Sequence, residues 1–451
     1  MKSITLNFNK EKFFKKTNVN IAAIPSKSHA HRILIASALS DRKTHIIIGS
    51  SSKDIDASIS CIRALGAAVE MTDDGLIVTP INCKSKIESS SNSTNLSSSI
   101  FSSDYCIPCL LDSGESGSTL RFLLPVIAAL GKSAEFSLHG RLSERPLSPL
   151  YEELQNHGIN LSAPGSNPIK ISGHLRGGTF TIAGNISSQF ITGLLLGLPL
   201  LDEDSEIHVT GTVESRPYID ITLDVLKTFG ISIYEDKKNQ IFFIRGGQFY
   251  HSPEEIKVSG DWSNAAFFLA AGALSPVPVT VTGLDFTSSQ GDKAILDILE
   301  NFGASITCTP PGKVTIYGKN LHGIQIDASN IPDLIPIISL VAAIADGKTV
   351  ITNIERLRIK ESDRAAAIIT TLSNLSADIH EENNSLIITG KNELSSAQCD
   401  SFNDHRIAMT AGIASIRTNG SITIINPDAV QKSYPGFYDD LSSFNVSHIN
   451  V

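Results

Sequence analysis

Basic side chains and small hydroxyl side chains recur in this sequence where helices are predicted to begin. The first cases are Lys27, Ser28 and Arg32 in PSKSHAHR, and Arg121 in the Gly/Ser-rich SGESGSTLRF. Similar motifs are ERP (144–146), SSQF (187–190), SRPYIDIT (215–222), KESDR (360–364), NDHR (403–406) and KSYP (432–435). The first turn of a helix offers unpaired N–H groups and a positive dipole end, which attract phosphate and carboxylate groups. The pattern therefore predicts that several helix starts together bind small anionic molecules.

Each motif taken alone has an ordinary structural explanation. A Ser or Asp at a helix start is most often an N-cap, KESDR fits an exposed ion-pair face, and His405 fits a structural hydrogen-bonding role. The sequence contains no P-loop, no GxSxG nucleophile elbow and no metal-ligand spacing, so we expect no cofactor and no catalytic metal. The joint occurrence of the motifs in an acidic chain is what favours an anion-binding cleft.

The composition excludes several classes of partner. The 451 residues are 41% hydrophobic and 18% charged, which is typical of a globular protein with two or three domains. A net charge of −9 argues against nucleic acid or an anionic membrane as the general partner. We expect the cytoplasm, because no signal peptide or membrane span is found and six scattered cysteines suit a reducing compartment. The Cys106-x-x-Cys109 spacing is interpreted as core thiols or chance rather than as a metal site.

A corner between a helix and a strand recurs six times along the chain. Its residue is small or polar in every copy: Gly66, Gly158, Gly230, Gly303, Ser376 and Asn445. These residue types suit a helix cap with a positive φ angle. An apolar helix and a strand precede each corner helix, so we expect six α-β-α-β units in two similar lobes that join near 247–260. The Ser-rich stretch 84–105 is expected to be a solvated loop between the first two units.

Taken in order, the motifs closely resemble those of the 5-enolpyruvylshikimate-3-phosphate (EPSP) synthase family. The resemblance covers about residues 20–440 and also includes GDWSNAAFFLAAGAL (260–274), QGD (290–292) and IPD (331–333). It implies an α/β (α+β) fold of two lobes, each of three βαβαββ units, with the active site in the cleft between them. The N-terminal strand crosses between lobes in that fold. The resemblance therefore implies one lobe of residues 1–24 and 260–451, and another of residues 25–259.

The resemblance also implies the reaction and the residues that bind its substrates. The enolpyruvyl (carboxyvinyl) group of phosphoenolpyruvate is transferred to the 5-hydroxyl of shikimate 3-phosphate, with release of phosphate, on the pathway to chorismate and aromatic amino acids. The implied residues for shikimate 3-phosphate are Lys27, Ser28, Arg32, Ser187, Ser188, Gln189, Ser215, Asp333 and Lys360. Those for phosphoenolpyruvate are Lys27, Gly117, Arg145, Gln189, Arg364, Arg406 and Lys432. A monomer is implied.

The residue types suit this chemistry. Both substrates carry a phosphate and a carboxylate, so several cations must converge, and Gly117 leaves room that a side chain would fill. Asp333 is the candidate base on the 5-hydroxyl, and Glu361 is the candidate acid and base at the methylene carbon. Lys27 and Lys432 are further candidates for proton transfer, and the sequence does not divide the roles among the four.

Two residues depart from the common family pattern, and two other functions compete with this one. Glu115 stands in GESGS where GNAGT is commoner, and Arg356 stands where many members have Asn. One alternative is UDP-N-acetylglucosamine enolpyruvyl transferase, which typically has Lys-Asn in place of Lys27-Ser28 and lacks the SSQ motif. The other is a non-catalytic anion-binding relative, which is disfavoured because the candidate catalytic residues are present.

Overall fold

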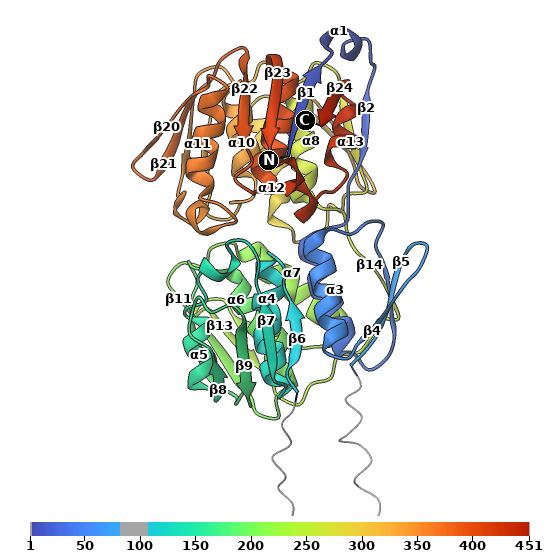
Figure 1. Ribbon diagram of the computed structural model, residues 1–451, viewed down its shortest axis with the longest axis vertical. Helices are drawn as coiled ribbons and strands as arrows, with labels where there is room; N and C mark the ends of the chain where they lie inside the picture. The colour runs from blue at the N-terminus through green and yellow to red at the C-terminus, as the bar shows by residue number, and fades with distance from the viewer. Residues whose placement is uncertain (1, 82–106, 451) are drawn as a thin grey trace, which may run out of the picture.

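The described part of the chain forms two lobes, drawn one above the other in Figure 1. The structure is a computed structural model that describes residues 2–81 and 107–450, so the stretch 84–105 and Cys106 lie outside it. The first lobe has a hydrophobic core drawn from residues 30–258. The core of the second lobe comes from residues 4–21 and 262–446. The predicted fold class of two similar α/β lobes is confirmed.

The first lobe contains three four-stranded sheets among the described residues. Its first unit comprises β14 (Glu255–Lys257), α2 (Lys27–Leu39), β3 (Thr44–Ile47), α3 (Lys53–Ala64), β4 (Ala68–Met71) and β5 (Gly75–Thr79). The second comprises β6 (Cys109–Asp112), α4 (Gly117–Ala129), β7 (Ala134–Ser137), α5 (Leu150–Asn156), β8 (Ile159–Leu161) and β9 (Ile169–Gly173). The third comprises β10 (Gly178–Ala183), α6 (Ser188–Gly197), β11 (Ser205–Thr210), α7 (Arg216–Thr228), β12 (Ile233–Asp236) and β13 (Ile241–Ile244).

The second lobe repeats this arrangement in the described residues. The fourth unit comprises β2 (Val19–Ala22), α8 (Trp262–Ala273), β15 (Val279–Thr282), α9 (Ile295–Asn301), β16 (Ser305–Thr309) and β17 (Lys313–Tyr317). The fifth comprises β18 (Gln325–Asp327), α10 (Ile335–Ala342), β19 (Lys348–Thr352), α11 (Arg364–Asn374), β20 (Asp378–Glu382) and β21 (Ser385–Thr389). The sixth comprises β22 (Leu394–Asp400), α12 (His405–Ala414), β23 (Thr418–Ile425), α13 (Phe437–Ser442), β24 (Val446–Asn450) and β1 (Ser3–Phe8).

All six sheets share one pairing pattern. The first two strands are parallel, as in β6–β7 and β18–β19, and the remaining neighbours are antiparallel. A parallel pair needs a crossover connection. The first helix supplies it in the second, third, fifth and sixth units, whereas β14 and β2 reach the first and fourth units from distant parts of the chain. The α-β-α-β unit expected from the repeat was therefore incomplete, because a further strand precedes the first helix and another closes the sheet. The observed unit is βαβαββ.

Three strands complete units that are distant in the sequence. β1 lies between β23 and β24, and β2 pairs with β15, so the N-terminal segment belongs to two sheets of the second lobe (Figure 1). β14 pairs in return with β3 of the first lobe. The two chain crossings run side by side, because Ser26 N donates to Ser259 O and Asp261 N donates to Ile24 O, both at 2.8 Å. The lobes are thus joined by one narrow pair of chain segments, which form a single β-bridge between Pro25 and Gly260.

The first helix of each unit is an inner helix. All eight residues of α10, from Ile335 to Ala342, are buried, and in α8 every residue except Ser263 is buried. A helix that is apolar around its whole circumference is stable only when other elements surround it. The fixed position of the inner helices fixes in turn the polar residues at their N-terminal ends.

The predicted corner residues all have a positive φ angle. The values are 110° at Gly66, 96° at Gly158, 78° at Gly230, 104° at Gly303, 65° at Ser376 and 58° at Asn445. A residue with a Cβ atom is strained in this region, and Gly or Asn tolerates it best. The six corners therefore confirm the repeat at the level of the backbone.

We expect Gly303→Ala to destabilise the second lobe more than Gly66→Ala destabilises the first. Both changes force Ala into a left-handed conformation, which costs roughly 1–2 kcal/mol. At Gly303 the new Cβ atom would also lie 2.7 Å from the Asn320 carbonyl oxygen, whereas at Gly66 the nearest atom is 3.8 Å away. The overpacking adds roughly 1–3 kcal/mol. Urea unfolding of the variants measures both effects.

The matched control for these variants is Gly49→Ala. Gly49 has no positive φ angle, and a Cβ atom there would meet nothing within 4 Å. This variant should unfold within about 0.5 kcal/mol of the parent protein. A Gly303→Ala protein as stable as Gly49→Ala would contradict the assigned role of the corners.

Candidate active site

A pocket lies where the two lobes face each other, and both lobes line it. From the first lobe its lining comprises Lys27, Ser28, Arg32, Asp54, Gly117, Ser118, Arg121, Phe122, Arg145, Pro146, Ile186, Ser187, Ser188, Gln189, Ser215 and Tyr218. From the second lobe it comprises Asp333, Arg356, Ile359, Lys360 and Glu361. Most of the residues expected to bind substrate are thereby brought together. Arg364 and Arg406 lie behind Asp333, and Lys432 lies beside Glu115.

The start of α6 presents two hydroxyl groups. Ser187 is the N-cap, and its hydroxyl accepts a hydrogen bond from Gln189 N at 3.3 Å, while Ser188 opens the helix. The Gln189 side chain is itself fixed, since it accepts from Arg121 Nη1 at 2.6 Å and donates to Ser118 Oγ at 3.0 Å. Hydroxyl groups at a positive dipole end suit a phosphate group.

Arg32 is a buried cation with neutral hydrogen-bond acceptors. Its guanidinium donates to Thr222 Oγ1 at 2.8 Å, and to the carbonyl oxygens of Ser28 at 2.5 Å and Tyr218 at 2.8 Å. Only 2% of Arg32 is exposed, and burial lowers its pKa to about 9. A buried charge is costly unless an opposite charge compensates it. Arg32 thus favours the arrival of an anion.

Arg121 is a second buried cation of this kind. It donates to Gln189 and, at 2.8 Å, to the Pro146 carbonyl oxygen. Burial, together with the nearby Arg145 cation, holds the pKa of Arg121 well below its usual range. Within the described residues, neither Arg32 nor Arg121 forms an ion pair with a carboxylate. The first lobe therefore contributes excess positive charge to the pocket.

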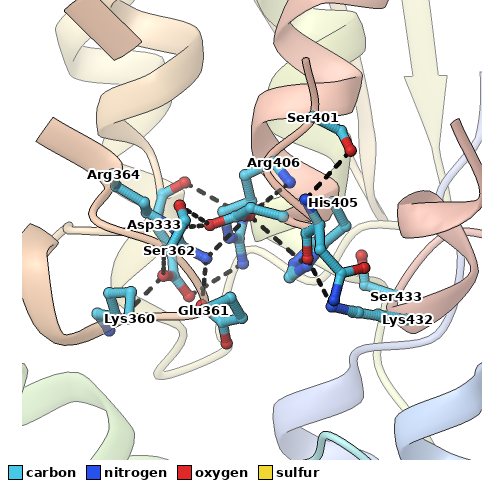
Figure 2. Close-up of polar contacts among 12 residues, drawn as sticks. Asp333, Lys360, Glu361, Ser362, Arg364, Ser401, His405, Arg406, Lys432 and Ser433 are labelled. Carbon is cyan, nitrogen blue, oxygen red and sulfur yellow. Dashed lines mark hydrogen bonds and ion pairs between the residues drawn. The ribbon is translucent and has the colours of Figure 1, made fainter. Parts of the chain in front are cut away.

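Asp333 is the counter-ion of the cations in the second lobe. Its Oδ1 atom lies 2.6 Å from Arg364 Nη1 and 3.7 Å from Lys360 Nζ, and its Oδ2 atom lies 2.9 Å from Arg406 Nη2 (Figure 2). Tyr218 of the first lobe donates its hydroxyl to Oδ2 at 3.0 Å. Burial raises the pKa of Asp333, but the Arg406, Lys360 and Arg364 cations outweigh it and hold this pKa well below its usual range. Asp333 is therefore ionised.

Glu361 lies between cations of both lobes. Its Oε2 atom is 2.6 Å from Arg364 Nη2, and its Oε1 atom is 3.7 Å from Arg145 Nη1. Burial raises the pKa of Glu361, but Arg364 and Arg145 outweigh it and hold this pKa well below its usual range. Its neighbour Lys360 behaves differently, because burial lowers the pKa of Lys360 to about 8 despite the attraction of Asp333.

Two further lysines are held by carboxylates of the first lobe. Lys27 Nζ lies 2.7 Å from Asp54 Oδ2, and Lys432 Nζ lies 2.7 Å from Glu115 Oε2. The second contact crosses between the lobes.

Gly117 at the start of α4 has no side chain for a steric reason, since a Cβ atom there would lie 2.8 Å from Arg145 Nη1. Arg145 can therefore lie directly against the start of α4.

The structure adds residues that the sequence did not assign, and it corrects one expectation. Asp54 and Tyr218 line the pocket as partners of Lys27 and Asp333.

His405 was expected to make structural hydrogen bonds, but both of its ring nitrogens are buried without a hydrogen-bond partner in the described structure. Burial, with the nearby Lys27 and Arg406 cations, holds the pKa of His405 well below its usual range, so the ring is neutral.

No group of three or more His, Cys, Asp or Glu side chains in 2–81 and 107–450 is placed to hold a metal ion. Over the same ranges, every helix is too short or too polar to cross a membrane.

The comparison with known proteins decides the family. The family model for EPSP synthase (3-phosphoshikimate 1-carboxyvinyltransferase) matches residues 14–441. The 3-phosphoshikimate 1-carboxyvinyltransferase of Clostridium perfringens (strain SM101 / Type A) is 42% identical over 93% of this chain and 94% of its own length. The chain belongs to the EPSP synthase family. The protein of the same name from Clostridium acetobutylicum is 41% identical over 92% of both chains.

Solved structures agree with this EPSP synthase fold. The EPSP synthase from Acinetobacter baumannii superposes with a TM-score of 0.78 over 100% of both chains, at 22% identity. The enolpyruvyl transferase NikO from Streptomyces tendae has a TM-score of 0.74 over 100% of this chain and 99% of its own, at 15% identity. At such identities the likeness establishes the two-lobe fold alone. The family assignment makes the protein a transferase of the shikimate pathway.

We expect Asp333→Asn to destabilise the second lobe by about 2–3 kcal/mol. The change leaves Arg364, Arg406 and Lys360 without a shared counter-ion. The cost stays below the roughly 3–5 kcal/mol of a fully buried broken pair, because Arg364 keeps Glu361 as a partner. Thermal and urea unfolding measure the loss.

The matched control for Asp333→Asn is Asp220→Asn. Asp220 pairs with Arg216 at 2.8 Å, but its side chain is 38% exposed. An ion pair of this kind contributes less than about 1 kcal/mol. Equal stability losses in the two variants would contradict the role of Asp333 as a buried counter-ion.

Proposed function

We propose that the pocket between the lobes is where this chain transfers the enolpyruvyl group of phosphoenolpyruvate to the 5-hydroxyl of shikimate 3-phosphate. The observation that carries this proposal is the unequal distribution of charge. The first lobe places Arg32 and Arg121 in the pocket with neutral acceptors only, so the pocket is suited to substrates that bring several negative charges. Each substrate carries one phosphate and one carboxylate.

The proposed acceptor site lies around the start of α6. Its residues are Lys27, Ser28, Arg32, Ser187, Ser188, Gln189, Ser215, Asp333 and Lys360. The hydroxyls of Ser187 and Ser188 suit the phosphate group of shikimate 3-phosphate. Lys360 and Asp333 face them from the second lobe, which would place the acceptor ring between the lobes with its 5-hydroxyl toward Asp333.

The proposed donor site lies between the starts of α4 and α11. Its residues are Lys27, Gly117, Arg145, Gln189, Arg364, Arg406 and Lys432. Arg145 and Arg364 approach Glu361 from opposite lobes, so a small anion held by both would lie beside that carboxylate. Guanidinium groups are suited to bidentate binding of carboxylate and phosphate.

The reaction needs three proton transfers, of which we assign one to Asp333 and two to Glu361. Asp333 is ionised and accepts the proton of the 5-hydroxyl group, while the oxygen of that hydroxyl group bonds to C2 of the donor. Glu361 gives a proton to the methylene carbon and takes one back as the C–O bond to phosphate breaks. A bound donor anion offsets the Arg364 and Arg145 charges, which raises the pKa of Glu361 and favours its protonation.

The lysines complete the site by electrostatic stabilisation. We assign Lys27 and Lys432 to the phosphate that leaves, because cations held there would stabilise the charge that develops in the transition state. The pH dependence of activity in variants of Lys27 and of Lys432 tests whether either lysine also transfers a proton. Closure of the lobes would exclude water and bring both substrates into contact.

The division of the chain follows from this arrangement. We assign residues 1–24 and 260–451 to one domain and residues 25–259 to the other, with the paired crossings at Ser26–Ser259 and Ile24–Asp261 as the hinge.

Every assigned residue lies on one chain, so a monomer suffices. The buried free thiols of Cys61 and Cys399 suit a reducing cytoplasm.

A phosphate-release assay with both substrates tests the function, and Glu361→Gln tests the mechanism. We expect kcat to fall by about 10²–10⁴, the usual range for loss of a general acid–base group, while KM for each substrate changes less than about threefold. The exposed Glu382 at the end of β20 provides the control Glu382→Gln, which should leave both constants unchanged. Binding of both substrates without phosphate release by the parent protein would show a non-catalytic relative instead.

The pKa of Lys360 predicts a pH dependence. Lys360 must be charged to bind an anion, and the charged form is lost as the pH rises through about 8. We therefore expect kcat/KM for shikimate 3-phosphate, which reports on the free enzyme, to fall by up to about tenfold between pH 7 and pH 9. In Lys360→Arg the guanidinium stays charged, so the fall should shrink to about twofold, the part expected from Arg32, whose pKa is about 9.

Lys170→Arg is the control for the pH profile. Lys170 pairs with Glu135 on the surface of the first lobe, and its side chain is 63% exposed. Its profile should match that of the parent protein. A Lys360→Arg enzyme that keeps the full fall above pH 8 would rule out Lys360 as its cause.

A further inference from the structure

Glu115 joins the two lobes at one side of the pocket. It lies in the loop between β6 and α4 of the first lobe, and its Oε2 atom is 2.7 Å from the Nζ atom of Lys432. Lys432 ends the 3₁₀ helix Pro427–Lys432 of the second lobe and is only 6% exposed. A carboxylate of one lobe is therefore the direct partner of a buried cation of the other.

The second lobe holds Glu115 with a second group. The Asn403 side-chain amide donates to Oε2 of Glu115 at 2.9 Å and to Oε1 at 3.2 Å. The Asn403 carbonyl oxygen accepts from Lys432 Nζ at 2.5 Å, and its Oδ1 atom accepts from Asn426 Nδ2 at 3.2 Å. Phe402, Asn403 and Asn426 all have φ angles of 53°. Left-handed backbone at non-glycine residues persists only where the surrounding contacts maintain it.

The first lobe is shaped around the same carboxylate. Gly140 has a φ angle of 54°, and a Cβ atom at this position would lie 2.5 Å from Oε2 of Glu115. The loop after β7 thus leaves space for the Glu115 side chain because residue 140 is glycine. Contacts from both lobes therefore specify where the carboxylate lies.

We propose that Glu115 is a positioning residue that sets the affinity for the anionic donor by serving as the counter-ion of Lys432. This inference rests on the proposed function, in which Lys432 binds phosphoenolpyruvate. Lys432 carries one positive charge, and Glu115 already balances it, so a donor that binds at Lys432 competes with this carboxylate. Arg32 and Arg121 differ in this respect, because their partners in the described residues are neutral.

The charge of Glu115 should affect the binding of the donor and not that of the acceptor. Glu115 touches Lys432 and Asn403, whereas the residues assigned to the acceptor phosphate lie at the start of α6. Removal of the negative charge should therefore tighten binding of phosphoenolpyruvate and leave shikimate 3-phosphate unaffected. A side chain whose only role was to support the fold would change both affinities or neither.

Glu115→Gln tests the proposal, because glutamine keeps a hydrogen-bond acceptor for Lys432 and Asn403 and removes the charge. We expect KM for phosphoenolpyruvate to fall by roughly two- to fivefold, the size expected for one partly exposed ion pair. KM for shikimate 3-phosphate and kcat should each change by less than about twofold. Glu115→Asp retains the charge and should keep KM for phosphoenolpyruvate closer to the parent value than Glu115→Gln does.

The matched control is Glu135→Gln, which breaks the surface pair with Lys170 in the same lobe and should leave all three constants unchanged. The melting temperature of each variant confirms that it is folded. An unchanged or raised KM for phosphoenolpyruvate in Glu115→Gln, with the variant folded, overturns the proposal. The variant Lys432→Met distinguishes a wrong role for Glu115 from a wrong assignment of Lys432 to the donor site. It should raise KM for phosphoenolpyruvate at least tenfold, and an unchanged value would refute the assignment of Lys432 itself.

Discussion

Compensation of buried positive charge is the constraint on which the pocket depends. Arg364 is 1% exposed in its side chain and contacts three carboxylates, those of Asp333, Glu361 and Asp404. Asp404 is fully buried, caps α12 and also accepts from Arg406 N at 2.9 Å. The starts of α11 and α12 are thereby linked, and Asp333 is held before the start of α10. A network of this kind is stable only if each charge has a partner.

The two lobes meet this constraint in different ways. In the second lobe Arg364, Arg406 and Lys360 are paired with carboxylates of the same lobe. These contacts leave Asp333 and Glu361 ionised and fixed in place. In the first lobe Arg32 and Arg121 are surrounded by neutral groups, so an incoming anion supplies the missing charge. Glu115 and Glu214 of the first lobe each provide a carboxylate to a cation of the second lobe, Lys432 and Arg356 respectively. Residues of both lobes line the pocket, and the paired chain crossings at Ser26–Ser259 and Ile24–Asp261 join the lobes.

Much of this arrangement could be predicted from the sequence. The corner residues marked the repeat because Gly, Ser and Asn report a backbone conformation directly, and the ordered motifs identified the family. The repeat did not locate the strands β6, β10, β18 and β22, because they are half-exposed and lack a strong apolar pattern. Only the βαβαββ units implied by the family resemblance anticipated a strand at these places. The pairing of β1 and β2 with strands hundreds of residues away also has no local signal.

The residues of the site show the same limit. Helix starts located Ser187, Arg364 and Arg406, since the signal for a helix start is local. Contacts between elements gave no such signal: Asp54 was not expected to pair with Lys27, nor Tyr218 to donate to Asp333. His405 was expected to be hydrogen-bonded, but its surroundings in the fold leave both ring nitrogens without a partner. Tertiary packing decides which side chains on different elements become hydrogen-bond or ion-pair partners, and no local sequence pattern indicates these pairs.

A crystal structure of the protein with shikimate 3-phosphate and phosphoenolpyruvate would test the central claim most directly. We expect the acceptor phosphate at the hydroxyls of Ser187 and Ser188, and the 5-hydroxyl within hydrogen-bonding distance of Asp333. The donor carbons should lie beside Glu361, between Arg145 and Arg364. Substrates bound to one lobe only, or an acceptor whose 5-hydroxyl points away from Asp333, would contradict the account.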